Sequence, residues 1–220
     1  MPTSCVEAAA GTFKSGVYKI HLKRLSTSPL EVFCSEETDF GGWLVIQRRI
    51  SDSVKYTQDW QAYKDGFGEI EGNYWIGLEK LHALTSSCEH GLHIEMERFD
   101  GENLYVKYTE FVIGSESERY ALKKMGNYTG NAGDGLIYHI YMKFSTHDRD
   151  NDLYEDYNCA KYYKGAWWFK RCLYSHLNGE YENKSDGINW ITIDRDEELK
   201  FVQMMIRPTE KCLRRISLIN

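Results

Sequence analysis

An acidic run between residues 148 and 156 has the residue types and spacing best suited to bind a hard cation. It reads Asp148-Arg149-Asp150-Asn151-Asp152-Leu153-Tyr154-Glu155-Asp156. Three aspartates at alternate positions of an irregular loop can converge on one calcium ion, with backbone carbonyls completing the ligand set. An EF-hand is excluded, because Leu153 occupies the position of its turn glycine and Cys159 that of its bidentate glutamate. The alternative is a solvated acidic loop, in which like charges about 5 Å apart repel by about 0.8 kcal/mol per pair.

The six cysteines are the second group with chemistry of their own. They contain no C-x-x-C pair, and no pair of histidines lies at zinc-finger spacing from them, which argues against structural zinc. An even number of widely spaced cysteines favours disulfides formed in an oxidising compartment, and six reduced, buried thiols are the alternative. Two N-glycosylation sequons, at Asn127 and Asn183, also favour a secreted, extracellular protein. The cysteines are Cys5, Cys34, Cys88, Cys159, Cys172 and Cys212.

Other classes of function are disfavoured by what the sequence lacks. It has no G-x-S-x-G, H-E-x-x-H, P-loop or dinucleotide-binding glycine motif, so we do not expect an enzyme. The net charge of −6 argues against a nucleic-acid partner. No apolar run approaches the length of about 18 residues that a transmembrane helix needs, so no membrane insertion is expected. Residues 1–11 lack a basic region followed by an apolar stretch, so they do not resemble a signal peptide.

Short strands and helices must position these groups. Alternating apolar residues predict strands over 17–22 and 43–48, each with one buried face. Trp60 and Tyr63 predict a helix over 57–65 that begins at a Thr57 cap and ends at Gly66. Further along the chain, the pattern predicts a helix over 78–84, a hairpin of strands 92–99 and 104–111, a helix over 115–124 and a strand over 201–206.

This order of elements has no β-α-β rhythm, so we expect an α+β fold with a mainly antiparallel sheet. Between residues 146 and 190 the regular periodicity disappears. A loop-rich stretch of that length in a compact domain is usually functional or held by cross-links. We therefore expect the binding chemistry in this stretch.

A series of short motifs extends over essentially the whole chain. It includes Gly41-Gly42-Trp43, Gln47-Arg48-Arg49, Gly72-Asn73-Tyr74-Trp75-Ile76-Gly77-Leu78, Asn158-Cys159-Ala160, Gly165-Ala166-Trp167-Trp168, Leu177-Asn178-Gly179, Gly187-Ile188-Asn189-Trp190 and Met205-Ile206-Arg207-Pro208. In this order the motifs resemble the fibrinogen-related domain. That family includes ficolins, tachylectins, the C-terminal globes of fibrinogen and angiopoietin-type ligands.

The resemblance implies one domain over 1–220 in three parts. These are an N-terminal subdomain at about 1–45, a central sheet and helix subdomain at about 46–125, and a loop-rich calcium and ligand-pocket subdomain at about 126–220. It also implies the disulfides Cys5–Cys34 and Cys159–Cys172, of which the second closes a short loop worth roughly 3 kcal/mol in the chain-entropy model. Cys88 and Cys212 are not part of this two-bridge minimum. The sequence leaves three alternatives for these two cysteines: a third bridge, two free thiols, or intermolecular links.

For the cation, the resemblance implies Ca²⁺ held by the side chains of Asp150 and Asp152 and by the backbone carbonyls of Tyr154 and Asp156. This chain has one residue more than usual between the aspartate run and Asn158. The insertion affects the Asp156 assignment most. The remaining polar residues of the run are expected in outer or solvent-facing positions, namely Asp148, Asn151 and Glu155.

For the ligand pocket, the resemblance implies a cis peptide bond between Arg171 and Cys172. In acetyl-binding relatives this bond directs the backbone N–H of the second cysteine at the acetyl oxygen, and aromatic rings pack on the methyl group. Tyr163 matches one such ring. Leu173 stands where a histidine often follows, which keeps apolar contact but removes a hydrogen bond.

Charge replaces aromatic rings at the other pocket positions. Lys184 and Ser185 stand where a tyrosine and a small residue are expected, and Asp196 falls near the next expected aromatic residue. Lys184 favours anionic ligands. The sequence therefore predicts a secreted recognition lectin for acetylated or acidic glycans on microbial or host surfaces. The alternative is a protein-ligand module that binds a peptide or receptor and has an inactive sugar pocket. The sequence leaves open whether flanking segments build an oligomer.

Overall fold

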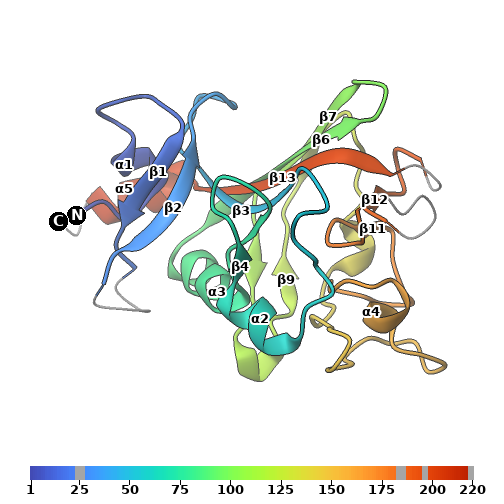
Figure 1. Cartoon of the computed structure of the whole chain (residues 1–220). Helices are drawn as coiled ribbons and strands as arrows, with labels where there is room; N and C mark the ends of the chain where they lie inside the picture. Colours follow the sequence, from blue (N-terminus) through green and yellow to red (C-terminus); the bar gives the residue numbers. More distant parts are fainter. Residues whose placement is uncertain (23–27, 182–186, 195–197, 218–220) are drawn as a thin grey trace.

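A nine-stranded sheet forms the frame of the protein, and every pair of neighbouring strands in it is antiparallel (Figure 1). The computed structural model describes residues 1–22, 28–181, 187–194 and 198–217. The strands of this sheet are Gly16–Ile20 (β1), Leu30–Ser35 (β2), Trp43–Arg49 (β3), Phe67–Gly68 (β4), Tyr74–Trp75 (β5), His90–Arg98 (β6), Asn103–Tyr108 (β7), Tyr128–Gly130 (β10) and Leu199–Pro208 (β13).

The other elements are short. Two further pairs of strands are Val112–Ile113 (β8) with Leu122–Lys124 (β9), and Ser175–His176 (β11) with Asn189–Trp190 (β12). The helices are Cys5–Ala8 (α1), Trp60–Asp65 (α2), Leu78–Ser87 (α3), Cys159–Tyr162 (α4) and Glu210–Ser217 (α5), with 3₁₀ turns at Glu116–Glu118 (η1) and Ile137–His139 (η2). The expected α+β class with a mainly antiparallel sheet is confirmed.

The last strand of the chain, β13, lies in the middle of the sheet. It pairs with β3 on one side and with β6 on the other. Val202, Met204 and Ile206 alternate along it and are buried in the main core. The predicted strand over 201–206 is confirmed, and it extends two residues further at each end. The sheet is therefore complete only when the C-terminal strand is in place.

Helices α2 and α3 cover one face of the sheet (Figure 1). The leucine stripe Leu78, Leu81 and Leu84 of α3 is buried, as the helical spacing predicted. The predicted hairpin is also confirmed as β6 and β7, because the two strands pair from Leu92 with Tyr108 to Glu97 with Asn103. No helix of the described residues covers the opposite face of the central strands (Figure 1).

Disulfides close the N-terminal part of the sheet and attach the C-terminal helix. Cys5 of α1 is bonded to Cys34 of β2. Cys212 of α5 is bonded to Cys88, which follows α3. The sequence left open whether Cys88 and Cys212 pair, and the structure contains this third disulfide. The described residues include no free cysteine.

The helix predicted over 115–124 is wrong. A capping box between Ser115 and Glu118 does begin a helical turn there, but only the three residues of η1 follow. Arg119 and Tyr120 then adopt positive φ values of 53° and 46°, which ends the turn. Burial of Tyr120 explains the difference, because its side chain enters the core and the chain then continues as β9.

Two other predictions need correction. The helix α2 begins at Trp60 and is capped by Asp59 rather than Thr57. The Asp59 side chain accepts a hydrogen bond from the Ala62 N–H, and the Thr57 hydroxyl donates to the Lys164 carbonyl instead. The strand β3 is buried on both faces, whereas its sequence predicted one. It lies between β2 and β13, and its polar side chains are used for contacts inside the protein.

The loop-rich part of the chain is anchored to the sheet through β3. The amide of Gln47 donates to the Leu177 carbonyl at 2.8 Å, and the guanidinium of Arg49 donates to the Gly179 carbonyl at 2.6 Å. Arg49 is 1% exposed and its guanidinium lies 3.8 Å from the centre of the Tyr56 ring. These contacts fix the loops that carry the candidate site relative to the frame. Among the described residues, no helix is long and apolar enough to cross a membrane.

Candidate functional site

The disulfide Cys159–Cys172 joins the two segments of the candidate site. Cys159 begins the short helix α4, and Asn158 caps it by accepting a hydrogen bond from the Lys161 N–H at 2.9 Å. The Asn158 amide also donates to the Thr146 carbonyl at 3.1 Å. One asparagine side chain therefore holds the start of α4 against the beginning of the acidic loop.

Asp152 links the acidic loop to the start of α4. One carboxylate oxygen accepts a hydrogen bond from the Tyr154 N–H, and the other accepts one from the Cys159 N–H, both at 2.8 Å. Asp150 in turn accepts a hydrogen bond from the Asp152 N–H at 3.1 Å. Burial raises the pKa of the Asp152 carboxyl above its usual value, and the neighbouring Asp150 carboxylate raises it further, against the effect of the two N–H donors.

This arrangement fits a hard cation. Two carboxylates lie side by side, and a cation between them would offset the repulsion that raises the pKa of Asp152. Within the described residues, no donor uses the backbone carbonyls of Tyr154 and Asp156, so both remain able to bind an ion. The described part of the chain holds no cluster of three or more His, Cys, Asp or Glu side chains of the kind a metal needs. A calcium site here would therefore depend on the carbonyls as well as on the two aspartates.

The acidic loop is connected directly to the predicted cis peptide. The Leu153 N–H donates to the Lys170 carbonyl at 2.9 Å, and the Lys170 N–H donates to the Cys172 carbonyl at 2.8 Å. The bond between Arg171 and Cys172 is cis, as the resemblance implied. Two backbone hydrogen bonds therefore connect the loop around Asp152 to the Arg171–Cys172 bond, so the conformation of the loop affects the position of this bond.

Aromatic side chains gather in this part of the chain, some in the core and some at the surface. Tyr163 is half-buried and stacks on Phe169, with ring centres 6.3 Å apart, and Phe169 contacts His176 edge-on at 5.0 Å. Leu173 is half-buried and packs against the core, whereas Arg171 is exposed. Three tyrosines of this region are well exposed, namely Tyr157 at 38%, Tyr162 at 56% and Tyr174 at 42%.

His139 is a positioning residue that sequence reasoning missed. Its Nε2 accepts hydrogen bonds from the backbone N–H groups of Tyr174 and Ser175, both at 3.1 Å, and its Nδ1 donates to the Trp168 carbonyl at 2.8 Å. Burial lowers the pKa of this imidazole to about 4, so it is neutral at pH 7. Nothing in the local sequence distinguishes it, because its partners lie far along the chain.

Several predicted positions fall elsewhere. Lys184, Ser185, Asp196 and the sequon residue Asn183 lie outside the described residues. The other sequon residue, Asn127, is exposed immediately before β10, so a glycan there would project into solvent. Asp148 accepts a hydrogen bond from the Trp60 N–H at 3.0 Å, which fixes it to the start of α2.

Comparison with known proteins places this geometry in a family. The family model of the C-terminal globular domain of fibrinogen beta and gamma chains matches residues 1–209. The human Fibrinogen C domain-containing protein 1 is 38% identical over 213 residues, which cover 92% of this chain and 46% of that protein. The chain spans about half the length of the first curated relatives it matches.

Solved structures agree with this result. The fibrinogen-like globe domain of human ANGPTL6 has a TM-score of 0.89 and 38% identity, with 96% of each chain covered. The lamprey fibrin D-dimer, solved with the peptide ligand Gly-His-Arg-Pro-amide, has a TM-score of 0.85 and 33% identity over 94% of this chain and 73% of that one. The chain belongs to the family of the fibrinogen C-terminal globular domain.

Proposed function

We propose that this domain is an extracellular, calcium-ordered binding module that recognises a protein or peptide ligand on the surface formed by residues 150–176, and that it catalyses no reaction. The single observation that carries the proposal is the group of exposed tyrosines beside the disulfide Cys159–Cys172. Tyrosine supplies a large contact area and a hydroxyl at a small cost in conformational entropy, and it is enriched where proteins bind one another. Three disulfides support an extracellular location.

Calcium would act on this surface through the loop. Asp150 and Asp152 would supply carboxylate oxygens, and Tyr154 and Asp156 would supply carbonyl oxygens. The ion supplies no reaction chemistry here; it neutralises the paired carboxylates. The chain itself does the positioning, because Asp152 holds the N–H of Cys159 and Leu153 bonds to the carbonyl of Lys170.

The apolar character of the site supports a protein or peptide ligand over a sugar. Leu173 offers a half-buried aliphatic surface where a histidine would offer a hydrogen bond, and Leu153 is 51% exposed nearby in the loop. Exposed apolar groups beside tyrosines suit the core of a protein interface. A related globe, in lamprey fibrin, is known with a bound peptide. An assembly that presents several such sites would depend on segments outside this chain.

A second candidate function is binding of acetylated or acidic glycans. The observation in its favour is the cis bond between Arg171 and Cys172. The disulfide partner of Cys172, Cys159, begins the short helix α4, and the half-buried Tyr163 ends that helix. An acetyl group needs a small apolar cup and a donor for its oxygen, and these residues could supply both. Arg171 is exposed and would favour acidic sugars over neutral ones.

A displayed random peptide library and N-acetylglucosamine resin, each tested with calcium, separate the two functions. We expect the wild-type domain to enrich peptides whose binding falls at least about tenfold in the Leu173→Asp variant, which buries a charge in the interface. The Tyr141→Asp variant is the matched control, because Tyr141 is 73% exposed and lies outside the 150–176 surface. Binding to the resin that free N-acetylglucosamine elutes, with no peptide enriched, would establish the lectin instead.

A further inference from the structure

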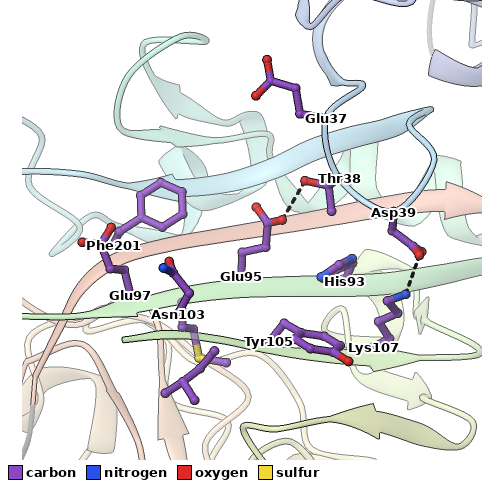
Figure 2. A pocket seen from close by; sticks show the side chains of 12 residues that line it. Glu37, Thr38, Asp39, His93, Glu95, Glu97, Asn103, Tyr105, Lys107 and Phe201 are labelled. Carbon is purple, nitrogen blue, oxygen red and sulfur yellow. Dashed lines mark hydrogen bonds and ion pairs between the residues drawn. The ribbon is translucent and has the colours of Figure 1, made fainter. Parts of the chain in front are cut away.

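A groove of about 590 Å³ lies on the face of the sheet that α2 and α3 leave uncovered (Figure 2). Side chains alternate between the two faces of a strand. His93, Glu95 and Glu97 of β6 therefore share the groove face, and Figure 2 shows them in a row along that strand. The residues between them are buried on the other face, in the main core: Leu92, Ile94 and Met96.

The segment between β2 and β3 forms one wall of the groove. The Thr38 hydroxyl donates to the Glu95 carboxylate at 2.7 Å, and Asp39 forms an ion pair with Lys107 of β7 at 2.7 Å (Figure 2). Arg207 of β13 also donates to the Asp39 backbone carbonyl at 2.7 Å. These bonds hold the wall in place before any ligand arrives, so the groove is preformed.

Negative charge in the groove is not fully compensated. Asp39 forms ion pairs with Lys107 at 2.7 Å and with Arg207 at 3.3 Å, and Glu97 pairs with Lys200 at 2.7 Å. Within the described part of the chain, Glu95 accepts hydrogen bonds only from neutral groups, the Thr38 hydroxyl and the Gln203 amide at 3.3 Å. Glu37 on the rim is exposed. Among the residues the structure describes, neither Glu95 nor Glu37 has a cationic partner. The four carboxylates of the groove therefore exceed the three cations paired with them by one negative charge.

His93 is a second, independent sign of a ligand. Its side chain lines the groove, yet the residue is only 4% exposed, and neither ring nitrogen has a hydrogen-bond partner among the described residues. The ring is held by an edge-on contact with Trp43 at 5.3 Å and a tilted contact with Tyr105 at 5.7 Å. A buried polar group left without a partner costs about 1–3 kcal/mol, so a ligand that satisfies it gains affinity.

The groove also offers aromatic surface. Tyr105 of β7 is 40% exposed and pairs across the strands with Glu95, and Phe201 of β13 is half-buried at the far end. His93 and Glu95 are two residues apart on one strand, so their Cα atoms are separated by roughly 6.6 Å. A planar cationic group that enters between them would lie beside the carboxylate, the imidazole and the ring of Tyr105.

We propose that this groove binds an arginine side chain of an extended peptide segment from a partner protein. The guanidinium donates to the Glu95 carboxylate and to an imidazole nitrogen of His93, and its plane stacks on Tyr105. A lysine ammonium is a point charge and lacks this flat surface, so arginine is preferred. The groove is separate from the 150–176 surface, so this proposal stands or fails independently of the function proposed above.

Binding of acetyl-Gly-Arg-Gly-Arg-Gly-amide to the whole domain tests the proposal, with lysine and citrulline versions of the same peptide beside it. Citrulline keeps the shape of arginine and removes the charge. Since a charge-assisted, stacked contact is lost, we expect the citrulline peptide to bind at least about tenfold more weakly and the lysine peptide about fivefold. The arginine peptide should also shift the ¹⁵N resonances of the His93 ring.

Variants locate the effect. Glu95→Gln keeps an acceptor for Thr38 but removes the charge, and we expect it to weaken arginine-peptide binding about fivefold or more. Glu69→Gln is the matched control, because it removes one exposed charge elsewhere and should change binding less than about twofold. Tyr105→Leu tests the stacking without disturbing the core, and should weaken the arginine peptide more than the lysine one. The proposal would be overturned by an equal loss of arginine-peptide binding in Glu95→Gln and Glu69→Gln, or by citrulline-peptide binding as tight as that of the arginine peptide. It would also be overturned if Mn²⁺ broadened the His93 signals while the arginine peptide had no effect on them.

Discussion

The carboxylate of Asp152 accepts a hydrogen bond from the backbone N–H of Cys159 at 2.8 Å, so the acidic loop is tied directly to the disulfide loop that contains the cis peptide. The same carboxylate is the one whose pKa is raised by burial and by Asp150. The charged form of Asp152 orders the binding surface, yet burial and the Asp150 carboxylate disfavour that form. A cation at this position would relieve that charge without breaking the hydrogen bond.

Calcium should stabilise the domain through this pair. A ligand that binds only the folded state at about one hundred times its dissociation constant adds about 2.7 kcal/mol, so we expect calcium to raise the melting temperature and EDTA to lower it again. Asp150→Asn should abolish the calcium effect. Asp156→Asn makes the same charge change and is the control. The proposed ligand at this position is the backbone carbonyl, which the substitution leaves in place, so the calcium effect should be retained. An unchanged calcium response in Asp150→Asn would show that the ion does not bind there.

The disulfide Cys88–Cys212 should stabilise the domain without shaping the ligand surface. It links residues 124 apart, and the chain-entropy model gives such a bridge roughly 4–5 kcal/mol. We expect the double variant Cys88→Ser, Cys212→Ser to lose several kcal/mol in urea unfolding while its calcium response persists. Peptide mapping without reduction should recover the bridged peptide, and alkylation of either cysteine in the native protein would contradict the pairing.

The sequence predicted the elements whose pattern is local. The leucine stripe of α3, the hairpin of β6 and β7, and the strand in β13 follow from residues close together in the chain. The helix over 115–124 failed because Tyr120 is drawn into the core, which no local pattern shows. His139 was missed for a similar reason, since its partners at 168, 174 and 175 meet it only in the folded protein.

Acid should destabilise the domain through His139. The pKa of this buried imidazole is lowered from 6.5 to about 4, so the unfolded chain binds a proton below pH 6.5 while the folded one does not until about pH 4. Stability is therefore lost as the pH falls from 6.5 toward 4, by at most about 1.4 kcal/mol per pH unit for one group. His139→Leu should reduce this slope, measured by urea unfolding at several pH values.

The same variant should loosen the chain after Leu173. Leucine leaves the N–H groups of Tyr174 and Ser175 without their acceptor, and buried unpaired donors cost about 1–3 kcal/mol each. We therefore expect lower stability at pH 7 and faster amide exchange at these two residues. An unaltered slope together with unaltered exchange would show that His139 has no such role.

Arg49 should be irreplaceable by lysine. Its motif, Gln47-Arg48-Arg49, and the motif Leu177-Asn178-Gly179 are far apart in the sequence, yet the Arg49 guanidinium donates to the Leu177 and Gly179 carbonyls at 3.2 and 2.6 Å. It also stacks over Tyr56 at 3.8 Å. Lysine keeps the charge but loses both the planar stacking and the directed pair of donors, so Arg49→Lys should cost about 1.5–3 kcal/mol of unfolding free energy. Lys19→Arg, an exchange between the same two residue types at an exposed position, should change stability by less than about 0.5 kcal/mol. Because the lost bonds hold the loop at 177–179, amide exchange there should accelerate more than in β6, and a uniform acceleration in both would show that Arg49 supports the whole core rather than this loop.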